Sequence, residues 1–145
     1  MSVRIGDHPV HAALVHFPIA LLLSTVLWDG VALTIEPAFW RFGFWVEALG
    51  LVAAAASAVV GFVDFVGLPE RAEATGWRHL VSASVGVVLF GAALLLRERL
   101  VADALGGVVL AIEVVGAGAI ALAGWFGAAL VFTHDVGRDE TRQRL

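Results

Sequence analysis

Four long apolar stretches dominate the sequence and limit what this chain can fold into. They cover residues of about 11–35, 42–67, 79–96 and 106–133. Each is close to the roughly 20 residues that an α-helix needs to cross about 30 Å of hydrocarbon. The breaks between them carry polar or helix-breaking residues, at Glu36-Pro37, Leu68-Pro69-Glu70 and Arg97-Glu98-Arg99. Because no stretch alternates strictly between apolar and polar residues, as a membrane strand would, the pattern predicts four membrane-spanning helices.

The composition supports this interpretation and excludes several classes of protein. Residues of the types AVILMFWYC make up 60% of the chain and charged residues 15%, against about 25% charged residues in a typical soluble domain. So few polar side chains cannot cover a water-soluble surface, which excludes a soluble globular enzyme, a disordered tail and a nucleic-acid-binding protein. The chain has no cysteine, and its single methionine is Met1. Disulfides, thiolate clusters, cysteine nucleophiles and a methionine haem ligand are therefore excluded as well.

Short connections place consecutive helices side by side and antiparallel. We therefore expect an all-α, up-and-down four-helix bundle, formed by residues 1–145 as a single transmembrane domain with both termini on the same side. Small and polar residues recur at alternating steps of three and four, a period that predicts left-handed packing. The expected inward-facing positions are His16, Ala20, Leu23, Leu27 and Gly30 in the first span; Glu47, Gly50, Ala54, Ser57, Gly61 and Asp64 in the second; His79, Ser82, Gly86, Leu89, Ala93 and Leu96 in the third; and Gly106, Leu110, Glu113, Ala117, Ile120, Gly124, Gly127, Val131 and His134 in the fourth.

The basic residues, all nine of them arginines, predict the orientation. Those expected on the side of the termini are Arg4, Arg71, Arg78, Arg138, Arg142 and Arg144, and those on the opposite side are Arg41, Arg97 and Arg99. Because cytoplasmic loops carry an excess of basic residues, this distribution predicts a multi-pass protein of the cell inner membrane with both termini in the cytoplasm. No small-residue cleavage site follows the first apolar run, so we expect that run to be retained as a helix.

The ionisable residues of the spans fall into two groups, one at each end of the expected bundle. The group at the terminal end consists of His8, His11, His16, Asp64, His79 and His134. The group at the opposite end is wholly acidic and consists of Asp29, Glu47 and Glu113. A charged side chain within a membrane costs about 2.5–3.5 kcal/mol on insertion scales, so such residues usually face the bundle interior and mark function. For residues at the ends of spans, anchoring in the headgroup region is the alternative role.

Two further details lie near the histidine-rich end. Pro18 lacks the N–H that would bond to the carbonyl of Leu14, so we expect a kink beside His16. The run Gly124-Trp125-Phe126-Gly127 sets two bulky rings between glycines. The glycines leave room for a neighbouring helix or for a flat ligand.

Several motifs follow one another along nearly the whole chain. They are His8-Pro9-Val10-His11, Val15-His16-Phe17-Pro18-Ile19-Ala20 with Asp29, Gly61-Phe62-Val63-Asp64, Gly76-Trp77-Arg78-His79, and the run from Gly124 to Phe132 with His134 and Val136-Gly137. In this order they resemble a bacterial four-helix membrane family, the domain of unknown function 2231. The resemblance implies a membrane location, four helices and a histidine-rich end. It implies no particular activity, although members also occur joined to redox domains.

The leading functional hypothesis is a b-type haem in an electron-transfer or binding subunit, rather than an enzyme. Bis-histidine ligation needs imidazoles from facing helices at similar depth, and the first and third spans of an up-and-down bundle are diagonal. His16 and His79 are the predicted ligands, and His11 with His79 or His16 with His134 are the alternative pairs. The small residues expected to make room for haem b are Gly61, Gly86, Gly124 and Gly127. Such a subunit would exchange electrons with a redox partner.

Two other functions stay open at this point. Three imidazoles and one carboxylate suit a divalent transition metal, and the candidate ligands are His16, Asp64, His79 and His134. The acidic set of Asp29, Glu47 and Glu113 would then line the other end of a metal or proton path. The remaining hypothesis is a non-catalytic interaction subunit without a cofactor. In that case polar pairs hold the helices in register within the lipid bilayer, alone or in a homo-oligomer.

Overall fold

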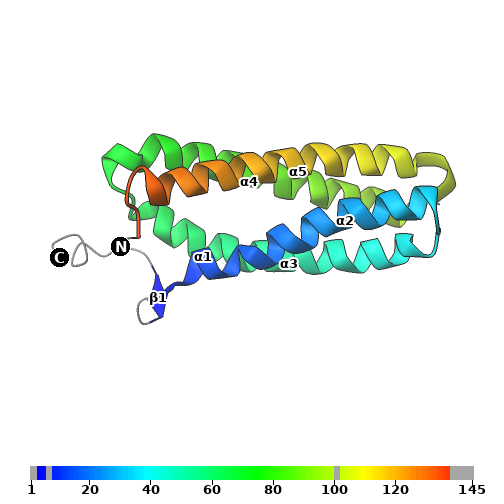
Figure 1. Ribbon diagram of the computed structural model, residues 1–145, viewed down its shortest axis with the longest axis horizontal. Coiled ribbons are helices and arrows are strands. Elements are labelled where there is room, and N and C mark those ends of the chain that lie inside the picture. The colour runs from blue at the N-terminus through cyan, green and yellow to red at the C-terminus, as the bar shows by residue number, and fades with distance from the viewer. Residues whose placement is uncertain (1–2, 6–7, 100–101, 138–145) are drawn as a thin grey trace.

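The structure, a computed structural model, describes residues 3–5, 8–99 and 102–137. Figure 1 shows an elongated helical bundle preceded by a short hairpin. Its elements are β1 (Arg4–Ile5), β2 (His8–Pro9), α1 (Val10–Leu14), α2 (His16–Thr34), α3 (Phe39–Val66), α4 (Glu70–Arg99) and α5 (Ala102–Phe132). Four helical stretches are long and apolar enough to cross a membrane: Val10–Thr34, Phe39–Val66, Glu70–Arg97 and Gly106–Phe132. The predicted helical class and the four spans are confirmed.

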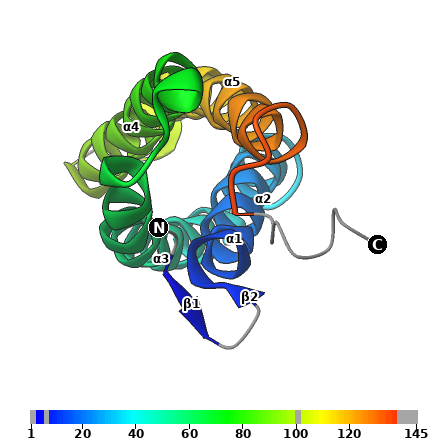
Figure 2. The same cartoon turned by 90° about the vertical axis from the view of Figure 1, so that its left-hand side faces the viewer.

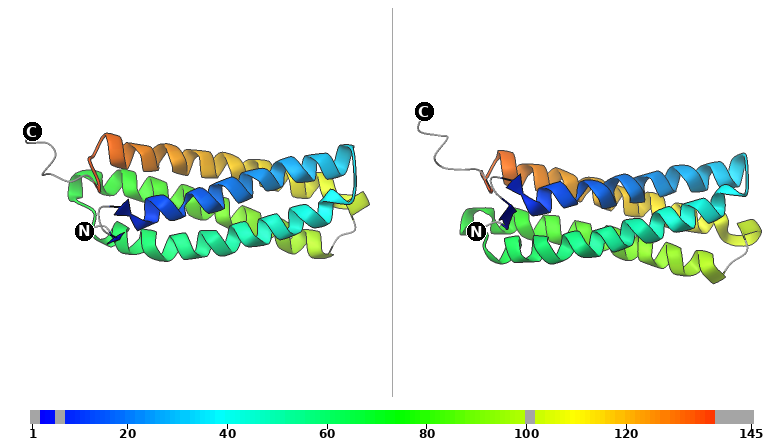
Figure 3. Two further views of the ribbon diagram at one scale, coloured as in Figure 1. Left: turned by 60° about the horizontal axis from the view of Figure 1, so that its bottom comes forward. Right: turned by 90° about the horizontal axis from the view of Figure 1, so that it is seen from below.

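The helices form a closed ring in the order of the chain, as the end-on view in Figure 2 shows. α2 packs beside α3, α3 beside α4, α4 beside α5, and α5 again beside α2. The helices run antiparallel to their neighbours along one common axis (Figure 3). The Arg4 side chain donates a hydrogen bond from Nη2 to the Gly137 carbonyl at 3.0 Å, which joins the two ends of the described chain. The up-and-down topology with both ends on one side is therefore confirmed.

The start of α4 differs most from the prediction. The helix begins at Glu70, nine residues before His79. The Ala72 N–H donates to the Pro69 carbonyl at 2.8 Å, and two acidic residues in the first turn, Glu70 and Glu73, complement the helix dipole. Because a helix rises 1.5 Å per residue, His79 lies about 13 Å inside α4 instead of at its beginning.

The first span is interrupted near Pro18, as predicted. α1 ends at Leu14 and α2 begins at His16, so the interruption falls on Val15. Pro18 has no N–H to donate to the Leu14 carbonyl, whereas the Ile19 N–H bonds to the Val15 carbonyl at 3.2 Å. The missing hydrogen bond accounts for the position of the break.

The inward face of α3 is the predicted one, and that of α2 is not. The buried residues of α3 are Gly43, Glu47, Gly50, Ala54 and Ser57. The buried residues of α2 are Pro18, Leu22, Thr25, Asp29 and Ala32. The expectation that Leu23 and Leu27 face inward is wrong, because their side chains are 41% and 62% exposed. A span that is apolar all round offers no contrast between faces, and the polar Thr25 and Asp29 identify the inward face of α2.

Of the fifteen positions predicted to face inward in the third and fourth spans, five are buried. Gly86 and Ala93 of α4 are buried as expected, but Phe90 and Arg97 occupy the positions predicted for Leu89 and Leu96. In α5 the predicted Gly106, Glu113 and Ile120 are buried, together with Val109, Gly116 and Ala123. The period of 3.5 residues therefore holds, while its phase shifts by one residue within each helix.

The middle of the bundle is filled by Leu22, Phe90 and Ile120. Each of these side chains packs over a glycine of a neighbouring helix. A Cβ atom on Gly50 would lie 2.8 Å from Leu22 Cδ2, one on Gly86 2.7 Å from Ile120 Cδ1, and one on Gly116 3.1 Å from the Phe90 ring. The glycines thus let bulky residues interlock, and this apolar layer separates the two polar ends of the bundle.

Candidate functional site

Two histidines, His11 of α1 and His79 of α4, face each other across the terminal end of the bundle. Their ring centroids are 6.2 Å apart, and the ring planes are nearly perpendicular, at 86°. Both side chains are half-buried. They come from diagonal helices, so they approach each other across the interior rather than along one helix-helix seam.

A backbone carbonyl fixes each ring. His11 Nδ1 lies 3.0 Å from the Ser57 carbonyl oxygen of α3, and His79 Nδ1 lies 2.8 Å from the Ala123 carbonyl oxygen of α5. A carbonyl oxygen only accepts hydrogen bonds, so Nδ1 carries the proton when either ring is in its neutral form. Each Nε2 is consequently left with a free lone pair, which is the state that a metal-ligating histidine requires.

The lengths of the helices bring these two residues to the same level. His79 is nine residues after the start of α4, Ser57 is nine residues before the end of α3, and Ala123 is nine residues before the end of α5. The first span begins deeper in the bundle than these helices end (Figure 1). A histidine near the start of α1 therefore lies opposite His79, although His79 is nine residues inside its own helix.

Glycines of the flanking helices lie against both rings. A Cβ atom on Gly61 of α3 would lie 2.5 Å from His11 Cε1, and one on Gly127 of α5 would lie 3.3 Å from His79 Cε1. Both were predicted to make room at this site. Gly124, predicted for the same role, is exposed, and a Cβ atom there would meet nothing within 4 Å.

Of the other candidate residues at this end, Asp64 interacts electrostatically with His11, and each of the others has a separate hydrogen-bond partner. His16 is exposed on the outer surface of α2, where its Nδ1 lies 3.3 Å from the Ala13 carbonyl oxygen. His134 Nε2 lies 3.0 Å from Thr75 Oγ1, and Asp64 Oδ1 accepts a hydrogen bond of 2.6 Å from the Val3 N–H. The structure thus brings His11 to His79 and leaves His16 outside. Within residues 3–5, 8–99 and 102–137, no group of three or more His, Asp or Glu side chains converges as metal ligands would.

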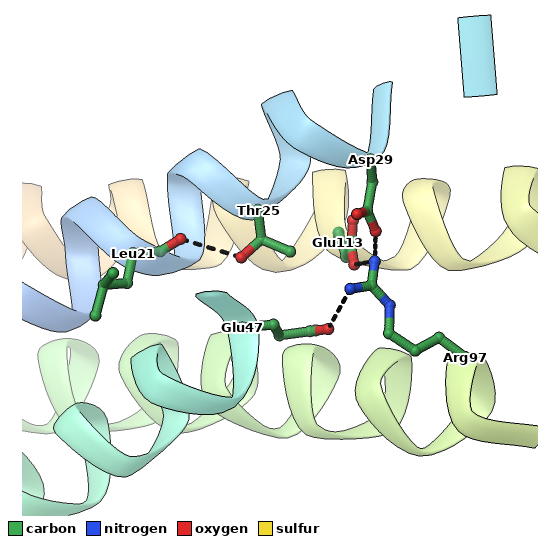
Figure 4. A network of polar contacts seen from close by, with 6 residues as sticks. All are labelled: Leu21, Thr25, Asp29, Glu47, Arg97 and Glu113. Atoms are coloured by element: carbon green, nitrogen blue, oxygen red, sulfur yellow. Dashed lines mark hydrogen bonds and ion pairs between the residues drawn. The ribbon is translucent and has the colours of Figure 1, made fainter. Parts of the chain in front are cut away.

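The opposite end of the bundle contains a buried group that we call the Arg97 cluster, consisting of Arg97, Asp29, Glu47 and Glu113 (Figure 4). Each of the four long helices contributes one member. Arg97 forms an ion pair with Asp29 through Nη2. It also lies 3.5 Å from Glu47 through Nη1 and 3.3 Å from Glu113 through Nη2. The three carboxylic side chains have no exposed surface.

The sequence predicts a wholly acidic group at this end of the bundle. This expectation is wrong, because Arg97 is part of the group. Arg97 was assigned to a loop because it opens the charged run that ends the third span. Its position four residues after the buried Ala93 was the signal that it continues the inward face of α4. Its guanidinium carbon lies 4.5 Å from the centre of the Trp40 ring, which covers it. Gly43 makes space beside it, since a Cβ atom there would lie 3.3 Å from Asp29 Cγ.

These features define a class: a small multi-pass membrane protein whose four-helix bundle carries a histidine pair at one end and a buried ionic cluster at the other. The chain belongs to the family described as predicted membrane protein (DUF2231), whose model matches residues 7–140. The resemblance drawn from the sequence motifs is thereby confirmed. No curated protein and no solved structure matches the chain.

Proposed function

We propose that this protein binds a b-type haem between His11 and His79 and transfers electrons within the membrane. The observation that carries the proposal is the separation of 6.2 Å between the two ring centroids. A nitrogen–metal bond is about 2.0 Å long, and the ring centre lies about 1.1 Å behind the nitrogen, so two trans imidazoles place their centroids about 6 Å apart. The observed separation fits this arrangement.

The same distance favours haem over a tetrahedral metal ion. Two imidazoles on a tetrahedral ion meet at about 109°, which would bring their centroids to about 5 Å. A tetrahedral site also needs two further ligands, and no described group of three or more His, Asp or Glu side chains offers them. His11 and His79 would therefore hold the haem, and no further ligand from the protein would be needed.

The contacts of the two rings are those expected of metal-bound histidines. Ser57 and Ala123 supply the carbonyls that orient the two rings, as outer hydrogen-bond partners of metal-bound histidines do. Gly61 and Gly127 keep side chains away from both rings. When bound, haem supplies one-electron chemistry whose potential depends on the axial ligands, their hydrogen bonds and burial. An electron carrier of this kind requires a redox partner at the membrane.

An optical spectrum of the purified protein, before and after reduction with dithionite, tests the proposal. Wild type from haem-replete cells is expected to show a Soret band that sharpens on reduction, with split visible bands. His11→Ala and His79→Ala should each lose this six-coordinate signature. His16→Ala is the matched control and should keep it, because His16 points outward. A featureless wild-type spectrum, or a signature that needs His16 instead of His11, would refute the proposal.

We also propose that the protein lies in the cell inner membrane with both termini in the cytoplasm. Burial of Arg97 removes it from the loops, so the arginine distribution becomes six on the terminal side against Arg41 and Arg99 opposite, which strengthens the positive-inside bias. The lack of cysteine permits labelling of single introduced thiols. In intact cells an impermeant thiol reagent should label Glu36→Cys and not Glu73→Cys; the reverse pattern would overturn the orientation.

A further inference from the structure

We propose that the Arg97 cluster is a proton-binding site in which Glu47 and Glu113 each hold a proton while Asp29 stays ionised against Arg97. The proposal concerns the end of the bundle opposite the histidine pair and does not depend on haem. It begins with the membership of the cluster. Among the described residues, the ionisable groups that meet here are Asp29 of α2, Glu47 of α3, Arg97 of α4 and Glu113 of α5.

The charges of the cluster balance only when protons are bound. Three carboxylates and one guanidinium carry a formal charge of −3 + 1 = −2. The three acidic residues have no exposed surface, and the Arg97 side chain is 1% exposed. Water therefore cannot screen the excess negative charge, and isolated buried charges are strongly disfavoured. Two protons make the cluster neutral.

The contacts of Arg97 indicate which carboxyl groups hold the protons. Asp29 forms the closest ion pair with the guanidinium. Glu113 shares the same Nη2 at 3.3 Å through a single oxygen, and its Oε2 has no hydrogen-bond partner among the described residues. Neither oxygen of Glu47 has a hydrogen-bond partner in that part of the chain. The oxygens of Asp29 also lack a hydrogen-bond partner among the described residues, so the ion pair with Arg97 is what distinguishes Asp29 from the two glutamates. An ionised carboxylate needs a compensating partner when it is buried, and the guanidinium supplies it to Asp29.

The packing favours proton exchange at the end of the bundle where the Arg97 cluster lies, opposite the histidine pair. Toward the histidines, the hydroxyl of Thr25 is already donated to its own Leu21 carbonyl at 3.1 Å (Figure 4). Beyond Thr25 follows the apolar layer of Leu22, Phe90 and Ile120. On the other side, the ring of Trp40, near the start of α3, lies over the guanidinium. Protons therefore enter and leave past Trp40.

Infrared spectroscopy of the full-length protein tests this assignment, in a detergent without ester or carboxyl groups. At neutral pH, wild type is expected to show the carbonyl stretch of protonated carboxyl groups. This band should shift to lower frequency in D2O and again when glutamate, but not aspartate, is labelled with 13C. These measurements need no variant, so they remain valid if a substitution prevents folding.

Substitutions then assign the band to residues. Glu47→Gln and Glu113→Gln should each halve its intensity, and the double variant should abolish it. Glu36→Gln is the matched control, an exposed carboxyl in the adjacent turn, and should leave it unchanged. Absence of the band at neutral pH would overturn the proposal, as would a band that is insensitive to glutamate labelling or that survives in the double variant.

Discussion

Replacement of Arg97 by methionine would remove the only cation of the Arg97 cluster while keeping most of the volume of its stem. Asp29 would then be left without its ion-pair partner at a position with no exposed surface. Loss of one partner of a buried ion pair costs about 3–5 kcal/mol, because the other charge is left unpaired. For a chain of about this size, 1 kcal/mol corresponds to a shift of roughly 2–4 °C in Tm. Arg97→Met is therefore expected to lower Tm by about 6–20 °C.

A second substitution separates the charge effect from a packing effect. Arg97→Met with Asp29→Asn removes both charges of the pair, and apolar or neutral replacements of a whole buried pair are often tolerated. The double variant should therefore recover most of the lost stability. Arg41→Met, an exposed arginine of α3 near the same end, is the control and should change the free energy of unfolding by less than about 0.5 kcal/mol.

The loss should also depend on pH. To bury Asp29 without Arg97, the folded variant must take up a proton that the unfolded chain lacks at neutral pH. A folded state that binds one more proton than the unfolded state loses about 1.4 kcal/mol of stability for each pH unit of increase. Thermal unfolding in detergent at pH 6 and pH 8 measures both effects. A Tm within 2 °C of wild type for Arg97→Met, or a double variant no more stable than the single one, would refute the reasoning.

Glycine-to-alanine substitutions test the close contacts at both ends. Gly43→Ala would place a Cβ 3.3 Å from Asp29 Cγ and should destabilise the bundle by about 1–3 kcal/mol. Gly118→Ala, with nothing within 4 Å, should be neutral or stabilise the bundle by up to about 1 kcal/mol. Equal thermal stability of the two variants would contradict the packing. Gly61→Ala would displace the His11 ring and should weaken or abolish the haem spectrum. Gly124→Ala, at an open position, should leave the spectrum unchanged. Identical spectra of the two variants would contradict the placement of the site.

The helices were predictable from the sequence, but half of their orientations were not. Span length and hydropathy are sufficient for four helices, because the bilayer dictates both. The inward face of α3 was predictable because Glu47, Gly50 and Ser57 stand out from their apolar neighbours. In the first span leucine lies on every side, and lipid is as apolar as a protein core. Only Thr25 and Asp29 distinguish its faces, and a seam drawn through His16 misses both.

The sequence offers His11 with His79 as one of the alternative ligand pairs. It does not predict where the helix that carries His79 begins. The residues from Glu70 to Arg78 are too polar to be counted as a membrane span, so His79 looked like the first residue of its helix. α4 in fact begins nine residues earlier, so His79 lies inside its helix, whereas His11 lies near the start of α1 and still faces it. The level of a side chain along the bundle axis depends on where its helix begins. Hydropathy indicates only which part of that helix contacts lipid.

The two polar ends are separated by about 15 Å of helix, since Glu47 and Ser57 lie ten residues apart on α3 and each residue rises 1.5 Å. The interval is filled by Leu22, Phe90 and Ile120, interlocked over glycines. The buried hydroxyl of Thr25 bonds within its own helix, and that of Ser57 has no hydrogen-bond partner among the described residues. Such a layer offers no hydrogen-bonded relay among the described residues. Under the two proposals, the histidine pair and the Arg97 cluster would exchange with opposite faces of the membrane. A change at one end would then reach the other through helix packing or through the electric field, not through a chain of proton transfers.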